Sequence, residues 1–171
     1  MRLPQLLLAC AALAGALLAH AEDVPDAREA PLATQALLLD VAHAGERLVA
    51  AGEHGIVLLS DDAGVHWRQA AQVPTRTTLT GLWFINDHEG WAVGHGGQIL
   101  STRDAGEHWS VQHGAIDGEN SLFGVWFGDA SHGLAVGPYG HALATADGGK
   151  SWQPLTVGEG DDAERHLNHL M

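Results

Sequence analysis

The chain has 171 residues and a formal net charge of −13 at pH 7, with 21 acidic against eight basic side chains. An acidic surface repels nucleic-acid phosphates and anionic lipid headgroups, so we expect no nucleic-acid partner. Cys10 is the only cysteine. No intrachain disulfide is therefore possible, and the stability of the fold must come from packing.

The N-terminus predicts export. Residues 1–21 have the pattern of a signal peptide, because Arg2 precedes an apolar run over 6–18 and an A-x-A cleavage site ends at Ala21. We expect cleavage near Ala21 and a periplasmic or extracellular mature protein. Cys10 leaves open the alternative of a lipoprotein signal, although the apolar run continues past it.

Residues 22–36, which contain two prolines, are typical of a flexible leader or linker. From residue 37 onward, short apolar runs alternate with turns rich in Gly, Asn and Asp, which are strand and hairpin signals. No stretch of this region holds a helical period for long. The runs repeat along the chain: 79–84 matches 122–127, 91–94 matches 134–137, and a weaker copy occupies 37–41 and 48–52.

Third strands are expected over 56–59, 98–101 and 141–144, and each leads into one signature, S/T-x-D-x-G-x-x-W. The signature aspartates, Asp62, Asp104 and Asp147, are 42 and 43 residues apart. This period fits one four-stranded β-propeller blade per repeat. We therefore expect an all-β fold of antiparallel blades, with each signature on the turn into the fourth strand.

The blades are expected over 37–70, 79–113 and 122–157, and residues 167–170 resemble the start of a fourth blade near 166. Closed propellers have about four to eight blades. We therefore expect the region 37–171 to be part of a six- or seven-bladed propeller, either as a fragment of a longer protein or as one of several copies that close a ring. An incomplete array leaves blade faces and strand edges open, which predicts self-association.

The residue types of the signature suit a tight turn. The aspartate carboxylate and the serine or threonine hydroxyl accept hydrogen bonds from turn N–H groups, and the glycine tolerates a positive φ. The tryptophan is expected to bury its ring beneath the hairpin. The residues to which we assign this structural role are Ser60, Asp62, Gly64, Trp67, Thr102, Asp104, Gly106, Trp109, Thr145, Asp147, Gly149 and Trp152.

We expect no catalytic, cofactor-binding or metal-binding residue among them. Carboxylates that catalyse glycoside hydrolysis together must flank one bond, whereas equivalent turns one blade apart do not converge on a point. The 12 histidines raise the alternative of a metal site. His66 and His108 occupy equal signature positions a blade apart, however, and a zinc ion needs three or four ligands at about 2.0–2.1 Å. Solvated turn histidines are therefore expected.

The signature and its period resemble the Asp-box, or bacterial neuraminidase repeat, proteins. More narrowly, the run Gly-Trp-Ala-Val-Gly over 90–94, followed by G-x-x-G and the signature, resembles the photosystem II stability and assembly factor family. The segment 133–152 repeats this pattern with Leu134 in place of tryptophan. The resemblance covers 37–171.

Photosynthetic members of that family are seven-bladed propellers that bind a newly made reaction-centre protein and assist photosystem II assembly, without cofactor or catalysis. The resemblance therefore implies a non-catalytic, exported scaffold that binds a protein partner, with a membrane or envelope protein as its client. The family docks its client through an arginine-rich patch. In this chain the arginines after the signal peptide are instead scattered: Arg28, Arg47, Arg68, Arg76, Arg103 and Arg165.

A sialidase-like glycoside hydrolase is the alternative function, because those enzymes share the Asp-box. They need three arginines, a tyrosine nucleophile with its glutamate partner, an acidic aspartate and an F-R-I-P-type stretch. This chain has no F-R-I-P stretch, and its only tyrosine, Tyr139, occupies a turn position matched by His54 or Gly96 in the other copies. We therefore expect Tyr139 to be a turn aromatic and the protein not to be an enzyme.

Aromatic residues recur on the predicted first strands. The four positions are Trp83, Phe84, Trp126 and Phe127. Because large aromatic side chains dominate protein cores, this recurrence predicts packing within the core or between blades rather than a ligand platform.

Overall fold

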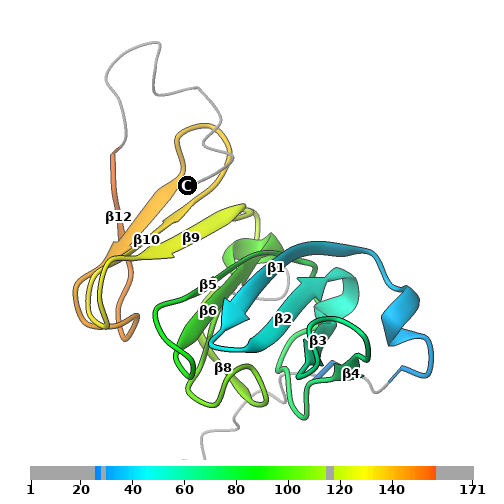
Figure 1. Cartoon of the computed structure of the whole chain (residues 1–171). Helices are drawn as coiled ribbons and strands as arrows, with labels where there is room; N and C mark the ends of the chain where they lie inside the picture. The colour runs from blue at the N-terminus through cyan, green and yellow to red at the C-terminus, as the bar shows by residue number, and fades with distance from the viewer. Residues whose placement is uncertain (1–25, 28–29, 115–117, 157–171) are drawn as a thin grey trace, which may run out of the picture.

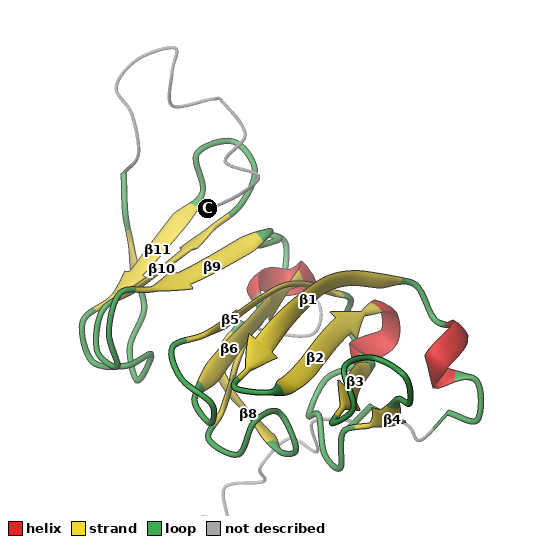
Figure 2. Ribbon diagram, in the orientation of Figure 1, coloured by secondary structure: helices red, strands yellow, loops and turns green. Residues whose placement is uncertain are grey.

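The computed structural model describes residues 26–27, 30–114 and 118–156, and within them the chain forms three separate β-sheets (Figures 1 and 2). Each sheet has four strands that lie in sequence order, and all paired strands are antiparallel. This arrangement confirms the predicted all-β fold of four-stranded blades. The predicted signal peptide and the predicted fourth blade lie outside the described residues.

The strands have the following bounds. Blade 1 contains β1 (Leu38–Ala44), β2 (Arg47–Gly52), β3 (Val57–Ser60) and β4 (Arg68–Gln69). Blade 2 contains β5 (Leu79–Phe84), β6 (Gly90–Gly94), β7 (Ile99–Thr102) and β8 (Trp109–His113). Blade 3 contains β9 (Gly124–Phe127), β10 (Gly133–Val136), β11 (Ala142–Thr145) and β12 (Gln153–Pro154).

The described helical pieces are three short 3-10 turns: η1 (Ala33–Gln35), η2 (Glu53–Gly55) and η3 (His95–Gly97). None of the helices in the described residues has the length and apolar character needed to cross a membrane.

The third strands begin one residue later than the sequence predicted. The amide of Ile56 donates to the carbonyl of Glu53 in η2, and the amide of Gln98 donates to His95 in η3. His141 is held by an equivalent bond in blade 3. Ile56, Gln98 and His141, where the third strands were expected to begin, are therefore still part of the preceding turns. Each third strand instead extends to the signature serine or threonine.

A glycine ends the second strand of blades 1 and 2 and directly follows that of blade 3, because the chain that enters the first strand crosses closely there. A Cβ atom at Gly94 would lie 2.2 Å from the carbonyl oxygen of Thr78, and one at Gly137 would lie 2.2 Å from that of Ser121. Any larger residue would push the two segments apart. This contact accounts for the final glycine of the Gly-Trp-Ala-Val-Gly run.

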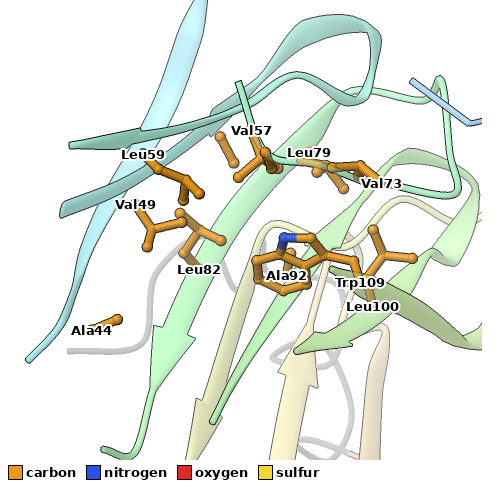
Figure 3. Close-up of a cluster of buried hydrophobic side chains, with 12 residues drawn as sticks. Ala44, Val49, Val57, Leu59, Val73, Leu79, Leu82, Ala92, Leu100 and Trp109 are labelled. Carbon is orange, nitrogen blue, oxygen red and sulfur yellow. The ribbon is translucent and has the colours of Figure 1, made fainter. Parts of the chain in front are cut away.

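Blades 1 and 2 pack face to face through a buried apolar cluster. Val49 and Leu59 of blade 1 meet Leu82, Leu100 and Trp109 of blade 2 (Figure 3). Because successive side chains of a strand point to opposite faces, each blade can pack against a neighbour on either side. Each such buried side chain stabilises the fold by about 1.5–3 kcal/mol.

Blades 2 and 3 pack in the same way. Trp91 stacks on Phe127 with ring centroids 3.5 Å apart, and Trp83 Nε1 donates a hydrogen bond of 3.0 Å to the carbonyl of Phe127. Phe84 meets Trp109 edge to face on the other side of blade 2. The predicted packing in the core or between blades is therefore confirmed for Trp83 and Phe127, which meet across the junction, and for Phe84, which packs against the cluster shared by blades 1 and 2.

The described part of the expected leader or linker is folded onto blade 1. Ala33 of η1 is buried against Ala50 and Leu58. The amide of Ala30 donates to Gln69 Oε1 at 3.0 Å. This part differs from the flexible segment that we expected, since small alanines pack closely while carrying no strand or helix periodicity that a sequence would reveal.

Both outer faces of the three-blade array expose positions that are buried between blades. Val41, Leu82 and Val125 are equivalent by strand register, yet Val41 is 57% exposed whereas Leu82 and Val125 are 6% and 4% exposed. Trp126 matches Trp83 and is 40% exposed, so it departs from the predicted packing. Among the described residues, no neighbouring blade covers Val41, and the Trp126 ring contacts blade 2 through Trp83, with ring centroids 6.4 Å apart.

Candidate functional site

Each signature forms a turn that is closed by its own side chains. In blade 2 the Thr102 hydroxyl donates to Asp104 Oδ1 at 2.9 Å and accepts from the amide of Gly106 at 3.1 Å. Asp104 Oδ1 also accepts from the amide of His108 at 2.9 Å. Such side-chain acceptors satisfy turn N–H groups that no strand partner reaches.

Blades 1 and 3 repeat these hydrogen bonds. The Ser60 hydroxyl donates to Asp62 at 2.9 Å, and the Thr145 hydroxyl donates to Asp147 at 2.8 Å. The signature glycine donates its amide to the hydroxyl at 2.8 Å in blade 1 and 2.9 Å in blade 3. The three turns are thus the same local structure, with the hydrogen bonds that their residue types predicted.

The tryptophans differ between copies. Trp67 and Trp109 donate their indole N–H groups to the carbonyls of the signature glycines Gly64 and Gly106. Trp152 is buried like Trp109, but its indole N–H has no acceptor among the described residues. The third turn therefore holds its tryptophan by packing alone.

Two consecutive residues in each turn have a positive φ. The signature glycines Gly64, Gly106 and Gly149 have φ values of 88°, 86° and 83°. The preceding residues are also left-handed: Ala63, Ala105 and Gly148, at 58°, 56° and 74°. The signature predicted a positive φ at the glycines but not at Ala63 and Ala105. The only sequence signal for a positive φ at that position was the glycine, Gly148, that the third copy has there.

The pKa values of the three signature carboxylates are lowered. The backbone N–H of His66 and the His66 side chain lower the pKa of Asp62 to about 2. The hydroxyl and then the amide of Ser151 lower the pKa of Asp147 to about 2. A carboxyl group with this pKa stays ionised at neutral pH and is a poor general acid.

The three signature aspartates do not share a site. Asp62, Asp104 and Asp147 line different surface clefts, each beside its own turn. Two carboxylates that act on one glycosidic bond lie about 5–9.5 Å apart on either side of it. The arrangement therefore suits three structural turns better than a catalytic pair.

The signature histidines bind within their own turns. His66 Nδ1 lies 2.6 Å from Asp62 Oδ2, and His108 Nδ1 lies 2.8 Å from Asp104 Oδ2. In blade 3 the Ser151 hydroxyl takes this place at 2.7 Å from Asp147. Within the described ranges, no group of three or more His, Cys, Asp or Glu side chains is arranged to hold a metal ion.

Tyr139 occupies the tip of a turn between the second and third strands of blade 3. Its φ of 56° matches that of His54 at 56° and Gly96 at 70°, at the equivalent positions. The side chain is 74% exposed. This placement agrees with the prediction of a turn aromatic.

An ion-pair network that the sequence did not predict closes the rim between blades 1 and 2. Arg47 Nε lies 2.6 Å from Asp61 Oδ1, and Arg47 Nη1 lies 3.2 Å from Glu107 Oε1. Arg68 forms a bidentate pair with Glu107. The hydrogen bond from Arg68 is the main cause that lowers the pKa of Glu107. Residues 60 positions apart are joined here, so no local pattern could reveal the contact.

The protein resembles known propeller proteins over part of their length. The photosystem II assembly protein Ycf48 of Thermosynechococcus vestitus is 37% identical over 49 residues, which are 29% of this chain and 14% of the relative. The chain thus spans a small part of the curated relative it matches. No family model matches it.

Solved structures share the fold more widely. YCF48 from Cyanidioschyzon merolae has a TM-score of 0.58 at 26% identity, covering 74% of this chain and 39% of that one. YCF48 bound to a D1 peptide has a TM-score of 0.60 at 23% identity, covering 70% and 40%. An ancestral GH74 enzyme has a TM-score of 0.58 at 15% identity, covering 78% and 19%. The last two likenesses concern the fold alone.

These similarities agree with the resemblance that the motifs carry. The described residues form blades of a partial β-propeller, and the chain resembles photosystem II assembly factors in sequence and in fold.

Proposed function

We propose that the chain is part of a non-catalytic propeller scaffold that binds a client protein and assists the assembly or stability of a membrane or envelope complex. The similarity to Ycf48, a photosystem II assembly protein, supports this class of function. A related propeller structure holds a D1 peptide, which supports a polypeptide as the class of ligand. The signal-peptide pattern over 1–21 supports export to the periplasm or the cell exterior.

The observation that carries the proposal is the engagement of each signature carboxylate within its own turn. Asp62, Asp104 and Asp147 each accept a hydroxyl hydrogen bond and an amide hydrogen bond from that turn. Carboxylates with these hydrogen bonds stabilise the turn between the third and fourth strands of their own blade. They do not form a pair on either side of one substrate bond. We therefore assign the twelve signature residues a structural role.

The hydrolase alternative remains a second candidate because an ancestral GH74 enzyme shares the fold. A shared fold does not transfer an activity, which depends on the site. Tyr139, the only tyrosine, lies on an exposed turn tip. A fluorogenic sialoside and a fluorogenic β-glucoside, incubated with the purified full chain, test this alternative directly. Turnover that Tyr139→Phe abolishes would establish an enzyme and overturn the scaffold.

The scaffold itself is tested by deleting the gene in the source organism. We expect one membrane or envelope complex to accumulate less, or to stall at an assembly intermediate, on native gels of the deletion strain. The full-length gene should restore the complex, whereas a gene lacking codons 2–21 should not, because the client is reached only after export. Unchanged complexes in the deletion strain would contradict the proposed function.

A further inference from the structure

The two junctions between blades carry opposite charges at equivalent positions. Strand registers and the signature define the equivalences. The matched pairs, blade 1–2 junction first, are Arg47 and Glu89, Asp61 and Arg103, and Glu107 and Lys150. Each charge is reversed from one junction to the next, so the equivalent contacts at the second junction would pair Glu89 with Arg103 and Lys150, as Arg47 pairs with Asp61 and Glu107 at the first.

At the first junction these charges meet. The Glu107 carboxylate forms ion pairs with the guanidinium groups of both Arg47 and Arg68. Arg47 also forms an ion pair with Asp61. The Arg47 Nη1 group additionally donates to the carbonyl of Ala105 at 3.3 Å. The rim between blades 1 and 2 is therefore closed by a carboxylate that lies between two cations.

At the second junction the charges do not meet. The side chains of Arg103 and Lys150 have no hydrogen-bond or ion-pair partner among the described residues. Asp147 accepts hydrogen bonds from its own turn, and Glu89 accepts one, from Asn86 Nδ2 at 3.1 Å. A cleft of about 250 Å³ opens between blades 2 and 3, and its wall contains both cations together with the carboxylates of Glu89 and Asp147.

Two buried polar atoms beside this cleft also lack partners. Trp91 lines the cleft, is 5% exposed, and has an indole N–H without an acceptor in the part of the chain that the structure describes. Gln112 lines the cleft too, and its buried Oε1 has no donor, although its Nε2 donates to Gly148 across the junction. Buried donors and acceptors are nearly always paired, so an unpaired donor and an unpaired acceptor in one wall leave two hydrogen bonds that a ligand could complete.

We propose that the cleft between blades 2 and 3 binds an extended acidic peptide segment, whose carboxylate lies between Arg103 and Lys150. A peptide group offers one C=O and one N–H, which complement the indole N–H of Trp91 and the Oε1 of Gln112. A side-chain carboxylate would then take the role at this junction that Glu107 has at the first. The inference rests on the proposed function and names the part of the client that the propeller holds.

The binding test uses the full chain and three fluorescein-labelled nonapeptides that differ only at three alternating positions, which carry Glu, Gln or Lys. Fluorescence anisotropy at low salt should show binding of the Glu peptide, with the Gln peptide about tenfold weaker and the Lys peptide weaker still. Binding of the Glu peptide should weaken as salt is added, because the contacts lie at a partly exposed rim.

Charge-reversal variants locate the binding site. Arg103→Glu and Lys150→Glu should each weaken the Glu peptide about tenfold. Arg76→Glu, an exposed cation outside the cleft, is the matched control and should change affinity less than about twofold. Because Arg103 and Lys150 are exposed and unpaired, their replacement should leave the melting temperature unchanged, which separates loss of binding from loss of folding.

Three outcomes would overturn the inference. Absence of Glu-peptide binding at millimolar concentration would remove the acidic-peptide site, as would equal effects of Arg76→Glu and Arg103→Glu. Tighter binding of a labelled oligogalacturonate than of the Glu peptide would reassign the cleft to acidic glycans. The gene-deletion phenotype is scored separately, so a normal scaffold phenotype with no peptide binding would refute the cleft and leave the proposed function standing.

Discussion

The carboxylate of each signature aspartate is defined by the hydrogen bonds of one turn rather than by its neighbours in other blades. Asp62 and Asp147 both accept from an amide four residues later, and both have a pKa of about 2. Asp104 makes the same bonds, and its pKa is also lowered, although desolvation opposes the shift. At the residue scale, therefore, three copies of one motif reach the same chemistry by local means.

Replacing Asp104 by alanine removes acceptors from a tight turn, and we expect it to lower the free energy of unfolding by about 1–2 kcal/mol. Trp109→Ala should lower it further, by about 3–5 kcal/mol, because it leaves a cavity between blades 1 and 2. Urea denaturation measures both. Trp126→Ala, at an exposed position of the same residue type, is the control and should change stability far less.

Alanine variants of the three signature aspartates can distinguish a structural role of the turns from a functional one. If Asp62→Ala, Asp104→Ala and Asp147→Ala left the melting curves untouched while abolishing client binding or turnover of a glycoside, the turns would be functional rather than structural.

Stability should decrease in acid between about pH 4 and pH 2. The pKa values of Asp62 and Asp147 are about 2 in the folded protein, below the ordinary value of 3.8, so the unfolded chain takes up protons first as the pH falls. The unfolded state then binds more protons than the folded state, and folding weakens through this window. Melting temperatures at a series of pH values should show a slope that Asp147→Asn reduces and Glu46→Gln, outside the signatures, does not.

At the scale of strands and turns, the sequence predicted the elements that neighbouring residues form. It did not predict the contacts that join segments far apart in the chain. The alternation of apolar residues located the strands of each blade, and the signature located the turn into the fourth strand. Neither pattern contains the contact of Arg47 with Glu107, which depends on how two blades are placed side by side. The packing of Ala33 on blade 1 escaped for a different reason, since a short 3-10 turn has no period to detect.

Glu107→Gln should weaken the contact between blades 1 and 2, because it removes the charge that two guanidinium groups share. The pair is partly exposed, so we expect a loss of about 1–2 kcal/mol at low salt and less at high salt. Combining Arg68→Glu with Glu107→Arg should recover part of the stability lost in either single variant. Failure of the double variant to recover any of it would mean that packing, not charge, dominates this rim.

At the scale of the whole molecule, the three blades follow one another in chain order (Figure 1). One apolar cluster is buried between blades 1 and 2, and another between blades 2 and 3. The period of 42 and 43 residues predicted this stack, because every repeat supplies equivalent apolar positions. The number of blades in the complete ring lies beyond such reasoning, since each blade contacts only its neighbours and carries no record of the total. Exposure at the two ends is the feature that distinguishes otherwise equivalent residues.

The chain without residues 1–21 should self-associate. Val41 on the outer face of blade 1 and Trp126 on the outer face of blade 3 are exposed, whereas Leu82 and Trp83, their counterparts in blade 2, pack against a neighbouring blade. Exposed apolar faces of repeat arrays need a cover to remain soluble. Light scattering should therefore give a mass above that of a monomer, either as two copies that complete a six-bladed ring or as larger aggregates. Val41→Asp combined with Trp126→Glu should shift the protein toward monomer without changing the signature turns. A monodisperse monomer with one cooperative melt, obtained with the unaltered sequence, would show instead that both outer faces are stable in water.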